Sequence, residues 1–183
     1  MKSLLIALLL STLTASVEPH EPVQPLDPAT ATSPDKAFFA ATRLTPDDKY
    51  IWKADLDFTR LVIFPLKNGD QFGRLYARHD IGGRFVAHLQ WSPDSKFVVL
   101  TTTSSGGHRP YHFQSFVFCV ADKSLRYMDS SIGMVLDSEF YFEEPDVAVM
   151  TVRAGSRDPL DPEGHKTVKI ALHEAIKKMK KIQ

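Results

Sequence analysis

Side chains suited to ligand recognition are concentrated in residues 104–113 of this 183-residue chain. Gly106 and Gly107 allow the backbone of this segment to bend freely. After them come side chains that donate hydrogen bonds or present an aromatic or imidazole ring, the types enriched where proteins bind partners. Our predicted binding residues are therefore His108, Arg109, Tyr111 and His112. A solvated hairpin loop without a ligand is the alternative.

Metal binding is the first chemistry to weigh for this segment. His108 and His112 are spaced like a helical zinc pair, but Gly106 and Gly107 before them and Pro110 between them disfavour a helix. No third ligand is identifiable from the sequence. We therefore predict no zinc site here, and no cofactor.

A second candidate metal site lies in residues 157–164, which carry Asp158, Asp161 and Glu163. Their spacing does not match an EF-hand loop, and the prolines among them indicate a stiff, exposed turn. The sequence therefore predicts no calcium site either.

Four carboxylates close together in sequence could be read as the paired acids of a glycoside hydrolase: Glu139, Glu143, Glu144 and Asp146. They fall at a strand end and turn, and nothing in the sequence sets the separation that such chemistry needs. The sequence also lacks a Gly-x-Ser-x-Gly elbow, a His-Glu-x-x-His motif, a phosphate loop and a Gly-x-Gly-x-x-Gly fingerprint. We interpret the four carboxylates as a solvated face and predict no catalytic residue.

Compartment is indicated by the start of the chain. Lys2, an apolar stretch over 4–13 and small residues at 14–16 predict a signal peptide over residues 1–16. The apolar stretch is too short to span a bilayer, which needs about 20 residues. We therefore expect an exported protein, periplasmic or secreted, without a transmembrane segment.

A proline-rich linker is predicted over residues 17–36. Prolines recur there every three residues, the period of a polyproline II helix: Pro19, Pro22, Pro25 and Pro28. A spacer between signal and fold is the interpretation we favour, and a ligand for an aromatic groove is the alternative.

Charge and cysteine content narrow the function further. Lys and Arg number 22 and Asp and Glu number 22, so the formal net charge is zero and no nucleic-acid partner is predicted. Cys119 is the single cysteine, so no intramolecular disulfide can form. It lies in the apolar run 115–121 and is interpreted as a buried structural thiol.

An internal repeat is the strongest pattern in the chain. Residues 38–52 align without a gap over residues 85–99, at an offset of 47. In each copy an apolar run ends at a Ser/Thr-Pro-Asp turn, and a second strand follows. The identical pairs are Phe38/Phe85, Ala40/Ala87, Pro46/Pro93, Asp47/Asp94 and Lys49/Lys96.

Third and fourth strands are expected in both copies. Third strands are expected over 60–64 and 115–120, in which residues 61–64 and 116–120 are continuously apolar, as is typical of strands covered on both faces. Fourth strands are expected near 75–76 and 125–127. With 63–64 aligned to 118–119, the second copy carries eight extra residues, which fall within 104–113 and mark that loop as an addition. A degenerate third copy begins at 140–142, passes a Pro-Asp turn and ends with a strand at 168–172.

The segment Trp91-Ser-Pro-Asp-Ser-Lys-Phe-Val-Val99 resembles the repeat of TolB-type β-propellers, in which a Trp-Ser-Pro-Asp-Gly-Lys turn joins the first two strands of each blade. Ser95 and Asp48 replace the glycine, and Leu44 replaces the tryptophan in the first copy. The resemblance covers roughly residues 37–172 and implies an all-β fold of about three tandem four-stranded antiparallel blades. It implies no partner, since propellers have many functions.

Three blades leave open ends, and the sequence offers two ways to protect them. A basic helix predicted over 173–183 could cap one end, with Leu172, Ile176 and Met179 on its apolar face. Alternatively, a homodimer could close one ring of six blades. Four lysines surround the apolar face of this helix: Lys177, Lys178, Lys180 and Lys181. They are interpreted as solvated, with an acidic partner or anionic lipid as the alternative.

Together these features predict an exported, non-catalytic binding or scaffolding module that presents blade loops to a protein, peptide or glycan. Two alternatives stay open. One is a small metal-dependent hydrolase using the 104–113 loop, and the other is a degenerate propeller that serves as a structural subunit.

Overall fold

The computed structural model describes residues 32–44, 59–67, 71–72, 74–81, 84–104, 113–154 and 164–182. Within these ranges the protein is made of antiparallel strands with two short helices, which confirms the predicted all-β class. No helix in these ranges is long and apolar enough to cross a membrane. The predicted signal peptide, residues 1–16, lies outside them.

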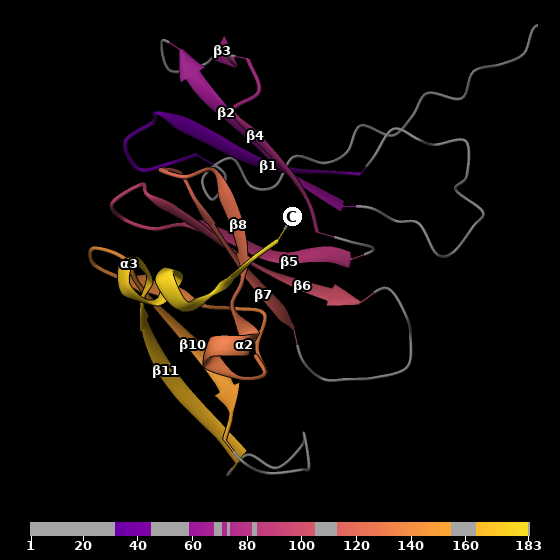
Figure 1. The fold of residues 1–183 in the computed structure, drawn as a ribbon, viewed down its shortest axis with the longest axis vertical. Coiled ribbons are helices and arrows are strands. Elements are labelled where there is room, and N and C mark those ends of the chain that lie inside the picture. The colour runs from indigo at the N-terminus through magenta and orange to yellow at the C-terminus, as the bar shows by residue number, and fades with distance from the viewer. Residues whose placement is uncertain are drawn as a thin grey trace, which may run out of the picture.

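Three antiparallel sheets make up the described fold (Figure 1). In the first, β2 (Thr59–Lys67) pairs with β1 (Phe38–Leu44), with β3 (Gln71–Phe72) and with β4 (Ala77–Asp80). The second has the order β12-β8-β7-β6-β5, built from β5 (Arg84–Trp91), β6 (Phe97–Ser104), β7 (Gln114–Cys119), β8 (Ser124–Tyr127) and β12 (Lys180–Lys181). The third has the order β11-β10-β9, built from β9 (Tyr141–Glu143), β10 (Val147–Arg153) and β11 (His165–Ala171).

The second sheet lies between the other two and is buried on both faces. Alternate residues of a strand point to opposite faces, and on β6 Val98 and Leu100 enter a core shared with the first sheet. Phe97 and Val99 enter a second core shared with the third sheet. The prediction that a continuously apolar run is covered on both sides is therefore confirmed for this sheet.

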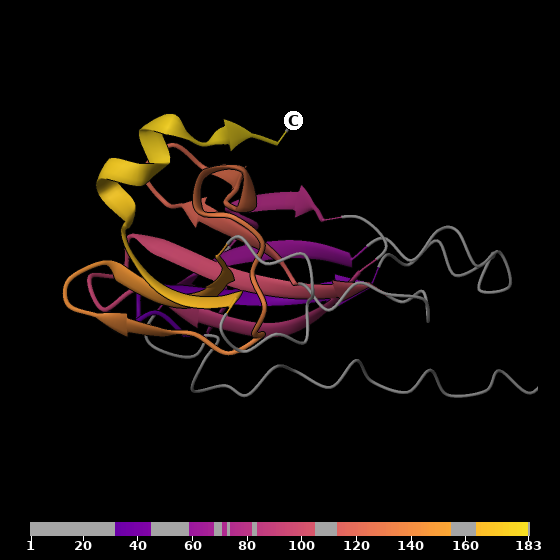
Figure 2. The same cartoon turned by 90° about the horizontal axis from the view of Figure 1, so that it is seen from below.

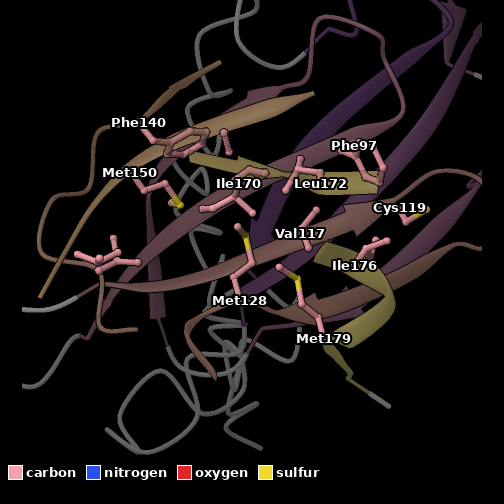
Figure 3. Close-up of a cluster of buried hydrophobic side chains, with 14 residues drawn as sticks. Phe97, Val117, Cys119, Met128, Phe140, Met150, Ile170, Leu172, Ile176 and Met179 are labelled. Atoms are coloured by element: carbon pink, nitrogen blue, oxygen red, sulfur yellow. The ribbon is translucent and has the colours of Figure 1, made fainter. Parts of the chain in front are cut away.

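Figure 3 shows the second core, in which Met150 and Ile170 of the third sheet face Val117 and Met128. The three sheets thus form an open stack, and the described residues form no closed ring.

The first sheet begins with a tight turn that the sequence analysis had placed in the linker. Ser33 Oγ donates to Asp35 Oδ1 at 2.6 Å and accepts the Phe38 backbone N–H at 2.9 Å. The Ala37 N–H donates to Asp35 Oδ1 at 2.9 Å, and Lys36 has a positive φ of 57°. The predicted linker 17–36 is therefore too long at its C-terminal end, because Thr32 already pairs with Phe39.

The turn between β5 and β6 repeats this geometry. Ser92 Oγ donates to Asp94 Oδ1 at 2.7 Å and accepts the Phe97 N–H at 3.0 Å. The Lys96 N–H donates to Asp94 Oδ1 at 3.1 Å, and Ser95 has a positive φ of 60°. The same bonds and the same left-handed position identify residues 33–38 and 92–97 as equivalent.

This equivalence corrects the repeat. Strand β1 follows its Ser-Pro-Asp turn, as β6 does, whereas the alignment of 38–52 over 85–99 placed the turn after it. The matching offset is 59, between Ser33 and Ser92, and β1 then pairs directly with β2 as β6 pairs with β7. The sequence contains both Ser33-Pro-Asp35 and Thr45-Pro-Asp47 with the same turn chemistry, so local pattern did not distinguish them. Residues 45–58 lie outside the described ranges.

The C-terminal segment differs from the predicted helix. The helix is short, α3 (Leu172–Ala175), and continues into the 3-10 turn η3 (Ile176–Lys178). Leu172, Ile176 and Met179 are buried, as the predicted apolar face requires. After them the backbone becomes extended (Figure 2). Strand β12 pairs with β8 as a fifth strand of the second sheet. The Ile182 N–H donates to the Leu125 carbonyl at 2.9 Å, so the tail adds backbone hydrogen bonds to the edge of β8.

Candidate functional site

One end of the stack is formed by tight turns that touch one another. The Asp35 N–H donates to Ser95 Oγ at 3.0 Å, which joins the first two Ser-Pro-Asp turns. The Asp94 N–H donates to the Pro145 carbonyl at 3.1 Å, which joins the second turn to the one between β9 and β10. Strands β1, β6 and β10 therefore begin side by side, and we name this end of the stack the turn edge.

The carboxylates of the turn edge are committed to structure. Burial alone would raise the pKa of Asp94, but hydrogen bonds from Ser92 and from Lys96 hold this pKa below its ordinary value. The pKa of Asp35 is lowered in the same way, because bonds from Ser33, Ala37 and Ser95 outweigh burial. Carboxylates that accept several hydrogen bonds as anions are poor proton donors, so these two are not candidates for acid catalysis.

Asp146 and His173, in the described ranges, form a carboxylate–imidazole pair of the kind found in catalytic triads. His173 Nδ1 lies 2.8 Å from Asp146 Oδ2, and the His173 backbone N–H donates to the same oxygen at 2.9 Å. The Asp146 carboxylate is buried and the imidazole is exposed. The other ring nitrogen lies 3.7 Å from a Glu174 oxygen, and no hydroxyl in the described ranges bonds to it. The pair therefore secures the start of α3, and no described hydroxyl or thiol is placed for it to activate.

The opposite end of the stack carries the long connections, and we name it the loop edge. Strands β1, β6 and β10 run away from the turn edge, and in Figure 1 the arrowhead of β6 points away from the end at which α3 lies. The connections that follow these strands are 45–58, 105–113 and 154–164. Of the three, 105–113 is the shortest, so the prediction that the second copy carries extra residues at this position is wrong.

The predicted binding residues lie within the middle connection and outside the described ranges: His108, Arg109, Tyr111 and His112. The acidic residues considered for calcium lie in the third connection and are likewise outside them: Asp158, Asp161 and Glu163. Both groups belong to connections that leave the loop edge.

A row of polar side chains crosses the second sheet near the end of β6 and the start of β7. His88, Thr101 and Ser115 are cross-strand neighbours on β5, β6 and β7. Thr101 and Ser115 are fully buried. Thr101 Oγ1 donates to the Ser138 carbonyl at 2.7 Å, and Ser115 Oγ donates to Asp129 Oδ1 at 2.5 Å. Both hydroxyl groups therefore donate to the segment 129–138, which connects the second sheet to the third.

The histidine of this row has a looser environment. His88 Nδ1 lies 3.4 Å from Glu139 Oε2, and its ring meets the Phe140 ring edge-on at 4.7 Å. His88 Nε2 is buried without a hydrogen-bond partner in the described ranges, and so is Arg153 Nε. This row was not among the residues predicted from the sequence. Its only signal was the hydroxyl residues that interrupt the apolar runs of β6 and β7.

The remaining predicted groups are separated by the fold. Glu139 faces His88, Glu143 binds Lys169 Nζ at 2.7 Å, and Asp146 binds His173, so these carboxylates do not form a hydrolase pair. Cys119 is buried, as expected of a structural thiol.

The lysines of the tail divide into two groups. Lys181 Nζ lies 2.9 Å from Asp122 Oδ2, and Arg126 Nη2 lies 2.7 Å from the same oxygen. Hydrogen bonds from Ser124, Lys181 and Arg126 outweigh burial and hold the pKa of Asp122 far below its ordinary value. The other three tail lysines are exposed: Lys177, Lys178 and Lys180.

Within the part of the chain that the structure describes, no three His, Cys, Asp or Glu side chains are grouped so as to hold a metal ion. Comparison of the chain with protein-family models, with curated proteins and with solved structures gives no match.

Proposed function

We propose that this protein is an exported, non-catalytic binding module whose three stacked sheets are propeller-like blades similar to the TolB-type repeat. The observation that carries the proposal is the arrangement of β1, β6 and β10, which begin side by side at the turn edge and therefore send their three connections to the loop edge. A rigid stack that gathers its longest loops at one end is the arrangement used by many β proteins for recognition.

The chemistry of the described residues supports binding over catalysis. Each candidate group has a structural partner: Asp94 in its turn, Ser115 on Asp129, and Asp146 on His173. A nucleophile must reach its substrate as well as a base, and the two serine hydroxyls that bond to carboxylates here, Ser92 and Ser115, are fully buried. The strands that the middle connection joins, β6 and β7, carry Thr101 and Ser115, both fully buried.

The test replaces His108, Arg109 and Tyr111 together by alanine in the full chain. Wild type and variant are immobilised and used to capture proteins and glycans from the envelope and secreted fractions of the source cells, with quantification by mass spectrometry. Loss of the wild-type partner with an unchanged thermal unfolding temperature is expected. A matched triple variant at exposed positions remote from the loop, Lys36→Ala, Lys96→Ala and Lys178→Ala, should keep capture. Equal capture by wild type and the loop variant contradicts the proposal.

A further inference from the structure

Strand β11 lies at the edge of the third sheet, whereas the strands equivalent to it in the other two sheets are paired on both sides. Strands β2, β7 and β11 are equivalent, since each pairs with the strand that follows the Pro-Asp turn of its sheet. On its other side β2 pairs with β4, and β7 pairs with β8. Strand β11 has no second partner strand among the described residues and forms the outer margin of the sheet (Figure 1).

The register defines which backbone groups face outward. The Ala154 N–H donates to the Gly164 carbonyl at 2.7 Å, and the Leu172 N–H donates to the Asp146 carbonyl at 3.1 Å, so even-numbered residues of β11 form the hydrogen-bonded pairs with β10. Hydrogen-bonded and non-hydrogen-bonded pairs alternate along an antiparallel ladder. His165, Thr167 and Lys169 therefore turn their N–H and C=O groups away from β10.

Side chains on the two faces of β11 differ in character. Val168 and Ile170 point to the second core, where Ile170 is buried and Val168 packs against the cluster. His165, Thr167 and Lys169 lie on the other face and are exposed. An added strand would therefore meet Val168 and Ile170, preceded along β11 by the exposed Lys166, on one face and a polar surface that carries Lys169 on the other.

The charge of the β11 edge favours some peptide sequences over others. Strand β11 contains Lys166 and Lys169 and no acidic residue. The carboxylate bound to Lys169 belongs to Glu143 of β9, and this pair is exposed, with Lys169 at 62% and Glu143 at 42% side-chain exposure. Lysines on an edge strand oppose pairing with apolar or cationic strands, including a second copy of β11. An acidic strand would be attracted.

We propose that β11 binds an extended peptide as the fourth strand of the third sheet, and that this peptide alternates acidic and apolar residues. The outward backbone groups of His165, Thr167 and Lys169 supply the ladder hydrogen bonds. The apolar side chains of the peptide extend the core beside Val168, and its carboxylates lie on the face of Lys169. This site is separate from the loop edge and does not depend on the proposed loop function.

The experiment titrates the full chain with fluorescently labelled synthetic heptapeptides and measures anisotropy. A peptide alternating glutamate and valine should bind. A lysine–valine peptide should bind at least about tenfold more weakly because its charge is reversed. The glutamate–valine peptide N-methylated at alternate amides should also lose at least about tenfold, because it lacks the donors that a ladder needs. Equal binding by all three peptides, or no binding by the first, overturns the proposal.

Two protein variants locate the site. Thr167→Pro removes an outward N–H that β10 does not use, and prolines are tolerated on such edges. Lys169→Glu reverses the charge, and Lys178→Glu is its control at an exposed position on η3. Thr167→Pro and Lys169→Glu should each weaken binding of the glutamate–valine peptide about tenfold or more. Lys178→Glu should bind this peptide as wild type does. The triple loop variant should also bind normally, which separates this proposal from the loop function.

Amide hydrogen exchange in the absence of peptide completes the test. His165, Thr167 and Lys169 are expected to exchange fast when free and to become protected when the peptide binds. Protection of these three amides without peptide would mean that another segment of the chain, or a second copy, already occupies the edge, and it would overturn the proposal.

Discussion

Ser33 and Ser92 show how much one hydroxyl organises in this protein. Each Oγ accepts the backbone N–H that starts the following strand and donates to the aspartate two residues later. Both serines are buried, so these hydrogen bonds take the place of the bonds that the same groups would make to water in the unfolded chain. Buried polar groups with partners of this kind define one backbone path where an apolar residue would allow several.

Another residue, His79, links the first sheet to the second and makes that contact sensitive to pH. Its Nε2 donates to the Lys123 carbonyl at 2.8 Å, and its ring packs on Phe118 at 5.5 Å. Burial lowers the pKa of His79, and the Lys123 carbonyl and Asp80 only partly oppose this. A folded-state pKa below the unfolded value means that the neutral imidazole is favoured in the fold.

We therefore predict that part of the stability is lost as the pH falls below about 6.5, where the unfolded chain binds a proton more readily than the folded protein. His79→Gln keeps an N–H donor and removes the titration. Its free energy of unfolding, measured by urea denaturation at pH 7.5 and 5.5, should change less than that of wild type. His165→Gln, at an exposed position, is the control and should leave the wild-type pH dependence in place. Parallel pH curves for wild type and His79→Gln would contradict the prediction.

Among the elements, the two Ser-Pro-Asp turns are the most informative. Their matching hydrogen bonds explain why β1 and β6 start in the same way. They also connect sheets, since Asp35 and Asp94 each donate a backbone N–H to the next turn. A change in one turn is therefore expected to affect the stack as well as its own hairpin.

We predict that Ser92→Ala lowers the free energy of unfolding by about 1–3 kcal/mol, because it leaves the buried Phe97 N–H without its acceptor. Ser33→Ala should have a similar cost, since the Phe38 N–H loses the same bond. Lys96→Ala is the control. Its side chain is 72% exposed and its ammonium lies 3.2 Å from Asp94 Oδ2, and the loss of such a surface pair should cost less than about 1 kcal/mol. Chemical denaturation measures the free energy of unfolding of all three variants. An unchanged value for Ser33→Ala would contradict the prediction that the two turns contribute equally to stability.

The C-terminal element shows the limits of periodicity. Spacing correctly identified the buried face of Leu172, Ile176 and Met179. It did not predict that the chain leaves the helix and pairs with β8, because that outcome depends on an available strand edge. The Ile182 N–H bonds to the Leu125 carbonyl and Lys181 bonds to Asp122, so tertiary contacts hold the extended form.

At the scale of the molecule, the second sheet contributes residues to both cores and should make the stack cooperative. Leu61 belongs to the first core and Met150 to the second, and both are almost completely buried. Leu61→Ala and Met150→Ala are each predicted to cost about 2–5 kcal/mol. Because the cores share the second sheet, each variant should shift one common calorimetric transition. A thermogram in which each variant moves a different transition would show independent sheets.

Ring closure by a second copy also belongs to this scale and stays a hypothesis. The native mass of the full chain in solution decides it, since a clean monomer eliminates a shared ring of six sheets.

The sequence by itself determined the features that a few neighbouring residues encode. Continuously apolar runs predicted strands that are covered on both faces, the resemblance at residues 91–99 implied the all-β class, and Ser-Pro-Asp chemistry marked the turns. Tertiary structure alone decided which turn is equivalent to which, where β12 pairs, and that His88, Thr101 and Ser115 lie side by side. The physical reason is that turn and strand preferences arise within a few residues, whereas strand pairing joins distant segments according to the edges and faces that remain free.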